Sequence, residues 1–284
     1  MELHNIYKSF NNNLILNNIS FDIKKGEIVG LVGKNGAGKS SLMKIISKLD
    51  TQFDGEIEQK GRLGYFIESP KLVTNRTGLW NLRYFSSIFG NKFIIEDYLD
   101  LYESIGIIDF LKKKVKKYSL GMKQKLGVLI ALLNDPDFVI LDEPTNGMDI
   151  DSSIVFLQEL RKISKEKNIG ILISSHKLED IELVCDRVLF LDNGKLENLS
   201  NQAYKNKIIH NLLFKNKSDL DLFLNNQEIG KIIEVKDTFI RIETNYSYIE
   251  LMDFIHKNNI DLVDYSNEQQ TLRGLYIEKV IKGD

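Results

Sequence analysis

The stretch Gly33-Lys34-Asn35-Gly36-Ala37-Gly38-Lys39-Ser40 decides the fold of this chain of 284 residues. It matches the pattern G-x-x-x-x-G-K-[ST] at every fixed position. The apolar run Ile28–Val32 precedes it, and an apolar period typical of a helix follows it at Leu42, Ile45, Ile46 and Leu49. Strand, glycine-rich turn and helix in this order predict a phosphate-binding loop, because the glycines let backbone N–H groups turn toward phosphate oxygens at the positive end of the helix.

Two residues of this loop have individual roles at a bound nucleotide. We expect Lys39 to reach the β- and γ-phosphates, and the Ser40 hydroxyl to bind Mg²⁺. The residues expected to line the nucleotide are Gly33, Asn35, Gly36, Ala37, Gly38, Lys39, Ser40 and Ser41. The alternative is a glycine-rich turn that only connects a strand to a helix, and the match at every fixed position disfavours it.

A pair of carboxylates completes the predicted metal and catalytic site. The apolar run Phe138–Asp142 is expected to form a buried strand, and Glu143 follows it directly. Asp142 at the strand end is suited to hold Mg²⁺, directly or through a water molecule. Glu143, one residue further out, is suited to orient and polarise the water that attacks the γ-phosphate. An acidic pair that only closes a strand is the alternative, and the phosphate-binding loop favours the catalytic interpretation.

Composition and charge exclude several classes of protein. Hydrophobic residues make up 43% of the chain and charged residues 27%, as in a globular protein with a full core. The net charge of −2 lacks the basic excess of a nucleic-acid binder, so no nucleic acid is expected as a partner. The single cysteine, Cys185, excludes an intramolecular disulfide and fits a reducing compartment.

We also expect no membrane span. Apolar runs such as 126–133 are far shorter than the roughly 20 residues that cross a bilayer. The N-terminal residues lack the basic and apolar regions of a secretory signal. These features predict a cytoplasmic protein that reaches a membrane only through a partner or a surface.

The sequence predicts two domains that meet near residue 200. Residues 1–200 alternate short apolar strands with helical patterns, which indicates an α/β fold with a sheet covered on both faces. Residues 72–122 show no clear strand, so we expect a helical subdomain inserted there, with Thr77 as the N-cap of one helix.

Residues 201–284 are predicted to form a small α+β domain. The expected order is β-α-β-β-α-β, as in ferredoxin-like folds. Its elements are a strand at 212–214, a helix at 219–225 capped by Ser218, a hairpin of 232–235 and 239–242, a helix at 246–257 and a strand at 261–265.

A third motif identifies a family resemblance. Tyr118-Ser119-Leu120-Gly121-Met122-Lys123-Gln124 resembles the L-S-G-G-Q signature of ATP-binding-cassette (ABC) ATPases. Leu120 stands in place of the first glycine of the signature and Met122 in place of its glutamine, whereas Ser119 and Gly121 are kept. The resemblance implies that Ser119, Gly121 and Met122 contact a γ-phosphate from a helix N-terminus. An ordinary helix capped by a serine is the alternative.

The resemblance extends over residues 1–200 and implies a P-loop ABC core that uses ATP and Mg²⁺. It implies that Phe10 stacks on adenine, although a core residue is the alternative. Asn146-Gly147-Met148-Asp149 resembles the loop that touches the partner cassette, with Asp149 near the nucleotide. His176 resembles the switch histidine that contacts the γ-phosphate, and a structural histidine is the alternative.

Glu68 marks a departure within the family. Most members carry glutamine at this position as a Mg²⁺ ligand, so the resemblance implies that Glu68 binds the metal. A glutamate here resembles the bacitracin-resistance and lantibiotic-immunity ATPases. The segments 116–126 and 174–183 look closer still to the ATPase of the phenol-soluble-modulin exporter.

The resemblance also implies partners and a task. Members of the family close their sites as head-to-tail dimers, so we expect a second ABC ATPase subunit, either a copy of this chain or a related cassette. A separate membrane permease would export a peptide or an amphipathic antimicrobial. The alternatives are a soluble ABC ATPase of translation or DNA repair, and a cassette regulated by a ligand-sensing domain at 201–284.

Two further surfaces have two interpretations each. The groove between 68–73 and the helix at 79–88 either receives the permease or belongs to the subdomain core. Its apolar residues are Trp80, Tyr84, Phe85 and Phe89. The basic run 112–117 is either a solvated loop or a contact with anionic lipid headgroups or with nucleotide across the dimer.

Overall fold

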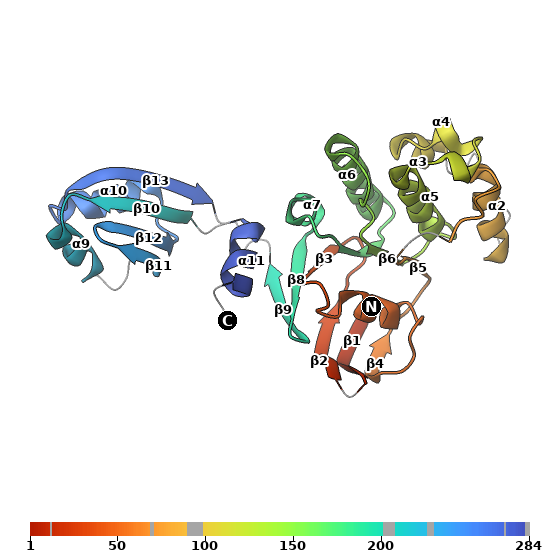
Figure 1. Cartoon of the computed structure of the whole chain (residues 1–284), viewed down its shortest axis with the longest axis horizontal. Helices are drawn as coiled ribbons and strands as arrows, with labels where there is room; N and C mark the ends of the chain where they lie inside the picture. Colours follow the sequence, from red (N-terminus) through yellow and green to blue (C-terminus); the bar gives the residue numbers. More distant parts are fainter. Residues whose placement is uncertain are drawn as a thin grey trace. The chain divides into compact units, whose positions relative to one another are not determined.

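A computed structural model describes residues 1–11, 13–68, 71–89, 99–200, 208–225, 230–269 and 271–281. The chain forms two compact units, Met1–Leu199 and Ser200–Asp284 (Figure 1). Among the described residues, no helix combines the length and the apolar character needed to cross a bilayer.

The first unit is built on a six-stranded sheet. The strand order is β5-β6-β7-β3-β8-β9. The strands are β5 (Leu63–Phe66), β6 (Phe138–Asp142), β7 (Gly170–Ser174), β3 (Ile28–Val32), β8 (Arg187–Asp192) and β9 (Lys195–Ser200). The first five pair in parallel, and every residue of β3, β6 and β7 is buried. This confirms the predicted α/β fold, because continuous apolar strands need cover on both faces.

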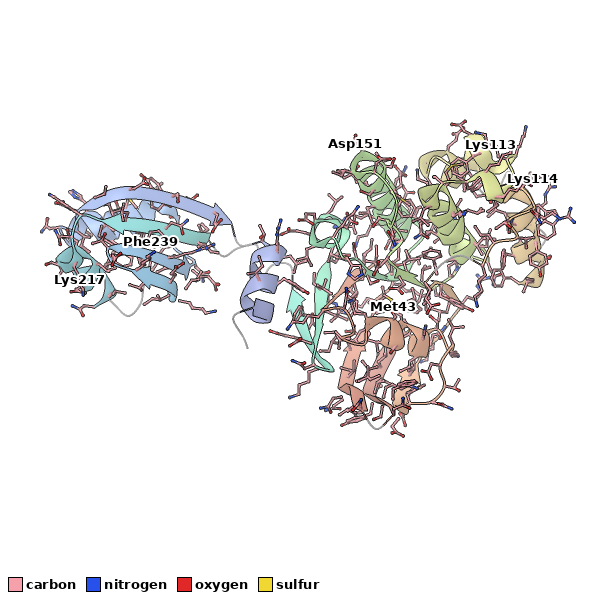
Figure 2. All side chains as sticks on the ribbon, viewed as in Figure 1. Met43, Lys113, Lys114, Asp151, Lys217 and Phe239 are labelled. Carbon is pink, nitrogen blue, oxygen red and sulfur yellow. The ribbon has the colours of Figure 1, made fainter. Side chains whose placement is uncertain are left out.

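A second, antiparallel sheet packs against the same core. Its strand order is β2-β1-β4, with β1 (Glu2–Phe10), β2 (Asn13–Asp22) and β4 (Asp54–Glu58). Helix α1 (Lys39–Ile46) buries Leu42 and Met43 in this core together with Leu31 of β3 (Figure 2). The sequence predicted that the helix would continue to Leu49, which is wrong. The helix ends at Ile46 because Lys48 takes a left-handed φ of 58°, and Leu49 is therefore exposed.

Helices form the rest of the first unit. They are α2 (Gly78–Ile88), α3 (Leu99–Ser104), α4 (Ile108–Leu111), the 3₁₀ turn η2 (Val115–Lys117), α5 (Leu120–Leu132), α6 (Ile150–Glu166) and α7 (Leu178–Val184). Figure 1 shows α2 to α5 gathered at one side of the unit. Thr77 caps α2 as predicted, since its hydroxyl accepts a hydrogen bond from Trp80 N at 3.1 Å. Cys185 is buried and is the C-cap residue of α7.

The second unit has the predicted β-α-β-β-α-β order. Its elements are β10 (Ile208–Phe214), α9 (Lys217–Leu224), β11 (Lys231–Lys236), β12 (Phe239–Thr244), α10 (Tyr248–Lys257) and β13 (Leu262–Gln269), followed by α11 (Leu272–Ile281). The strands pair antiparallel in the order β11-β12-β10-β13, which places the two halves of the motif side by side. Leu212, Phe223 and Ile240 are buried between the sheet and its helices.

One predicted cap in this unit is wrong. Asn216, not Ser218, caps α9, and its side chain accepts a hydrogen bond from Asp219 N at 3.0 Å. Asn216 has extended backbone angles and precedes the helix, whereas Ser218 already lies inside it. Both residue types favour the N-cap position, so the backbone angles decide between them.

Candidate functional site

The phosphate-binding loop joins β3 to α1 at the carboxyl edge of the parallel sheet. Gly38 caps α1 with a φ of 103° and provides no side-chain acceptor for the first N–H groups of the helix. Those N–H groups therefore point into the loop, as binding of phosphate oxygens requires. A Cβ at Gly38 would meet the side chains of Ile15 and Leu16 at 3.0 Å, and Gly36 has a φ of 81°. These two glycines give the loop its turn.

Lys39 lies inside this loop, beside both predicted carboxylates. Its Nζ donates hydrogen bonds to Gly33 O at 2.7 Å and to Lys34 O at 3.1 Å. Burial lowers the pKa of the Lys39 ammonium, and the charges of Glu143 and Asp142 act against this effect. The ammonium thus lies at the phosphate-binding loop, where it can reach phosphate.

Ser40 and Asp142 meet as predicted for a Mg²⁺ site. Ser40 Oγ donates to Asp142 Oδ2 at 3.3 Å, and Ser174 Oγ donates to Asp142 Oδ1 at 2.6 Å. A hydroxyl and a carboxylate are hard oxygen ligands that suit Mg²⁺. Within the described ranges, no group of three or more His, Cys, Asp or Glu residues forms a metal cluster. Mg²⁺ sites in nucleotide enzymes do not need such a cluster, since phosphates and waters complete the coordination.

The side chains of Glu143 and His176 meet just beyond the ends of β6 and β7. The distance from His176 Nε2 to Glu143 Oε1 is 2.5 Å. Glu143 has a left-handed φ of 50°, and its N–H donates to Ser174 O at 3.2 Å and to Ser174 Oγ at 3.1 Å. A non-glycine residue in this conformation is strained, so the bonds to Ser174 hold the carboxylate in its position. Both side chains are partly accessible, as a site for water and phosphate requires.

Ser174 and a neighbouring hydroxyl network are site features that the sequence did not predict. Ser174 pairs with Asp142 in the register of β6 and β7, and its hydroxyl contacts both Asp142 and Glu143. Thr145 Oγ1 donates to Asp180 Oδ2 at 2.6 Å, and Ser175 Oγ donates to the same oxygen at 3.3 Å. The available signal was that Asp142 and Ser174 are both the last residues of apolar strands, which meet if the strands are neighbours.

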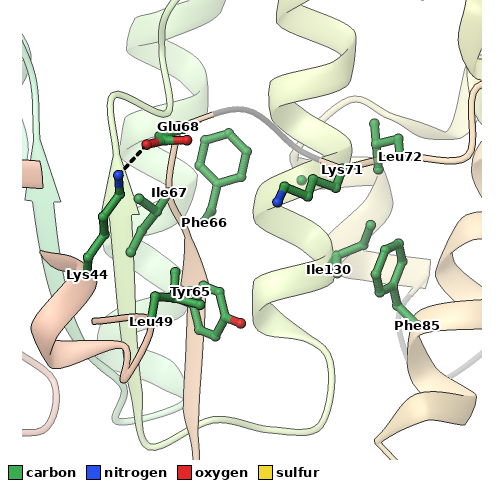
Figure 3. Close-up of a pocket in the computed structure, with 11 residues that line it drawn as sticks. Lys44, Leu49, Tyr65, Phe66, Ile67, Glu68, Lys71, Leu72, Phe85 and Ile130 are labelled. Atoms are coloured by element: carbon green, nitrogen blue, oxygen red, sulfur yellow. Dashed lines mark ion pairs between the residues drawn. The ribbon is translucent and has the colours of Figure 1, made fainter. Parts of the chain in front are cut away.

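Glu68 binds a lysine of α1. Its Oε1 lies 2.5 Å from Lys44 Nζ, and Figure 3 shows this pair at the edge of a cavity. The hydrogen bond from Lys44, aided by its charge, holds the pKa of the Glu68 carboxyl below its usual value. Glu68 is therefore ionised, but the structure gives it Lys44 as a partner rather than Ser40 or Asp142.

Phe10 ends β1, and 64% of its surface is exposed. This exposure excludes the alternative that Phe10 is a core residue. An exposed aromatic ring at this position remains suited to stack on a base.

The start of α5, which carries the signature residues, packs against the loop before α6. Ser119 caps α5 and accepts from Met122 N at 3.2 Å. A Cβ on Gly121 would meet Gly147 O at 3.1 Å, so this end of α5 packs against loop 146–149. Asp149 caps α6 and accepts from Ser152 N at 2.8 Å. Loop 146–149 thus contacts the start of α5 and leads directly into α6.

A cavity of about 300 Å³ lies between β5, α2 and α5 (Figure 3). Its apolar lining includes Tyr65, Phe66, Leu72, Phe85 and Ile130. A second cavity of about 410 Å³ shares three of these side chains and adds Ile88 and Phe89. The predicted groove therefore exists in part, and strand β5 contributes to it as well.

Two of the four predicted apolar anchors lie elsewhere. Trp80 and Tyr84 stack on each other with ring centroids 5.0 Å apart, and neither lines the two cavities. Phe85 and Phe89 do line them. None of the four is fully buried, whereas Leu82 on the same helix is. The prediction thus holds for two residues only, because helix α2 turns the other two to a different side.

Comparison with known proteins adds independent findings. Residues 16–146 match the family described as ABC transporter. Over 219 residues the chain is 35% identical to YhcH of Bacillus subtilis (strain 168), an uncharacterized ABC transporter ATP-binding protein, covering 72% of this chain and 71% of the relative. Over 208 residues it is 38% identical to SrtF of Streptococcus pyogenes, a lantibiotic transport ATP-binding protein, covering 69% of this chain and 88% of SrtF.

A solved structure of the ATP binding subunit of an ABC transporter has a similar fold. The TM-score is 0.64 and the sequence identity 26%, over 72% of this chain and 91% of that one.

Proposed function

The chain belongs to the ABC transporter ATP-binding proteins, an ATPase family, and from this premise we propose that it powers export of a peptide or an amphipathic antimicrobial through a separate membrane permease. The observation that carries the ATPase part is the meeting of five side chains at one edge of the sheet. They are Lys39, Ser40, Asp142, Glu143 and His176. The cargo rests on the similarity to SrtF.

The mechanism follows from where these groups lie. The loop N–H groups and Lys39 bind the β- and γ-phosphates of ATP. Mg²⁺, held by Ser40 and Asp142 and with Glu68 as a proposed further ligand, would neutralise phosphate charge when bound. Glu143 accepts a proton from the attacking water. The oxygen of that water bonds to the γ-phosphorus while the bond between the γ-phosphorus and the β–γ bridging oxygen breaks. His176 contacts the Glu143 carboxylate and would hold it in position.

We propose that the working form is a head-to-tail dimer of cassettes. The support is that Gly121 packs on loop 146–149 of its own chain and that Ser119 bonds within α5, so neither of these contacts involves the phosphate-binding loop. A contact of Ser119, Gly121 and Met122 with a γ-phosphate then requires a second cassette, either a copy of this chain or a related one. Asp149 and loop 146–149 would line the contact between the two cassettes, and Phe10 would stack on the adenine.

The permease is proposed to dock at the cavities beside β5. Apolar side chains from β5, α2 and α5 offer a surface for a short helix of a membrane protein. This contact would hold the chain at the cytoplasmic face of the membrane. The domain from about residue 201 to 284 would be an accessory unit, because the nucleotide site lies wholly in the first unit.

The variant Glu143→Gln tests the proposed ATPase mechanism. It keeps the shape of the side chain and removes the base, so we expect ATP binding to persist and kcat to fall at least ~100-fold. An ATP-dependent dimer should accumulate, as measured by size-exclusion chromatography. Near-normal turnover would remove Glu143 from the catalytic role.

The membrane part needs a separate experiment. The full chain would be expressed with its candidate permease and purified in detergent, with Phe85→Ser as the disrupting variant and Tyr84→Ser as the matched control. Loss of the permease with the first variant only is the expected result. Equal recovery with all three proteins would refute docking at these cavities.

A further inference from the structure

One surface of the first unit carries almost only positively charged side chains. Residues 106–123 contain six lysines and a single acidic residue, Asp109. Residues 71–89 contain three basic residues and no acidic one. The chain as a whole has a net charge of −2, so this concentration of positive charge is local.

Main-chain hydrogen bonds hold these two segments together. Val115 N donates to Arg76 O at 2.9 Å, and Lys116 N donates to Thr74 O at 2.8 Å. Gly78 N donates to Lys113 O at 3.3 Å, and Thr77 forms a bridge with Lys114. The basic run is therefore an ordered part of the subdomain rather than a loose loop.

Burial of every third or fourth residue in this run turns the lysines outward. Leu111, Val115 and Tyr118 are buried, and the five lysines between them at 112–114, 116 and 117 are exposed. Figure 2 shows Lys113 and Lys114 at the outer edge of the subdomain. Within the described part of the chain, no acidic side chain forms an ion pair with these five lysines. Burial raises the pKa of Tyr118 to about 12, so its phenol adds no compensating charge.

Aromatic rings lie beside this charge. The guanidinium of Arg76 lies 5.3 Å from the ring centroid of Trp80, and Tyr84 stacks on the same ring. Trp80 is half-buried and Tyr84 is exposed. Tryptophan and tyrosine favour the headgroup level of a bilayer, and lysine and arginine favour anionic headgroups.

We propose that this surface, made of Arg76, Trp80, Tyr84 and the lysines of 112–117, binds the anionic phospholipid headgroups of a membrane. This goes beyond the proposed function, because the ATPase chain itself contacts lipid and needs no permease to do so. The cations attract the headgroups, and the two aromatic rings enter the interfacial layer. The charge is present before any protein partner binds, so the contact would place the cassette at the membrane surface.

The attraction between the lysines and anionic headgroups is tested with full-length protein and vesicles. Vesicles of phosphatidylcholine alone are compared with vesicles of equal parts phosphatidylcholine and phosphatidylglycerol in a sedimentation assay. We expect binding to the anionic vesicles only, and loss of binding as NaCl is raised. Equal binding to both kinds of vesicle, or to neither, would overturn the proposal.

A charge-matched pair of variants locates the surface. In Lys113→Gln/Lys114→Gln/Lys116→Gln, each lysine removed is expected to cost up to about fivefold in affinity, so the triple variant should bind at least ~10-fold more weakly. The control Lys60→Gln/Lys162→Gln/Lys195→Gln removes three exposed lysines elsewhere and should bind within about twofold of the original protein. Equal losses in both variants would show that only net charge matters and would refute this site. ATPase activity of both variants checks that the cassette remains folded.

The aromatic part has its own signal. Trp80 is the only tryptophan in the chain, so its fluorescence reports on this surface alone. Anionic vesicles should move its emission to shorter wavelength, and neutral vesicles should not. Unchanged emission at saturating anionic vesicles would show that Trp80 does not enter the interfacial layer.

Discussion

Ser174 is the residue whose loss we expect to damage the proposed Mg²⁺ site most without removing a ligand. Its hydroxyl is buried and donates to Asp142 Oδ1 at 2.6 Å. In Ser174→Ala, Asp142 Oδ1 loses this donor inside the protein. The Glu143 N–H keeps its bond to Ser174 O at 3.2 Å, so the backbone of Glu143 retains one of its two partners.

The expected loss in free energy of unfolding depends on the charge of the group that accepts the hydrogen bond. A hydrogen bond to a charged group contributes about 1.5–3 kcal/mol, and one between neutral groups about 0.5–1.5 kcal/mol. Ser164→Ala is the matched control, because Ser164 is equally buried and its Oγ donates to the neutral Ile169 O at 2.8 Å. We therefore expect Ser174→Ala to lower the free energy of unfolding by about 1 kcal/mol more than Ser164→Ala does. Urea denaturation at neutral pH measures both.

The same variant has a functional consequence that the control lacks. A ligand that loses its supporting hydrogen bond is less well oriented, and such losses cost about 10–100-fold in metal affinity. Ser174→Ala should raise the Mg²⁺ concentration for half-maximal ATPase activity about tenfold, and Ser164→Ala should leave it unchanged. If both variants lost the same stability and their Mg²⁺ titrations coincided, the argument that Ser174 orients Asp142 would be wrong.

Two further variants address the nucleotide and the metal. Phe10→Ala should weaken ATP and GTP binding alike, because stacking on an exposed ring tolerates either base, and a loss limited to one nucleotide in fluorescence titrations would contradict simple stacking. Glu68→Gln should raise the Mg²⁺ requirement of the ATPase if Glu68 leaves Lys44 to join the metal; an unchanged titration would exclude Glu68 as a ligand.

Local patterns in the sequence were sufficient for much of the fold. The phosphate-binding loop, the buried strand before Asp142, the Thr77 cap and the element order of the second unit each depend on residues close together in the chain. The ends of helices were harder to predict from the sequence. Asn216 and Ser218 are both good N-cap residues, and the end of α1 depends on the left-handed backbone of Lys48. Two similar local choices differ by too little energy for the residue types alone to decide.

The sequence by itself determined that a phosphate-binding loop and the carboxylates of Asp142 and Glu143 belong to one α/β unit. Only the tertiary structure decided that Ser174 supports Asp142, that Glu68 binds Lys44 and that 74–78 is bonded to the run 113–116. The reason is physical. Periodicity and caps arise between neighbours in the chain, whereas these contacts depend on strand order, on register and on how two segments far apart in sequence exchange main-chain hydrogen bonds.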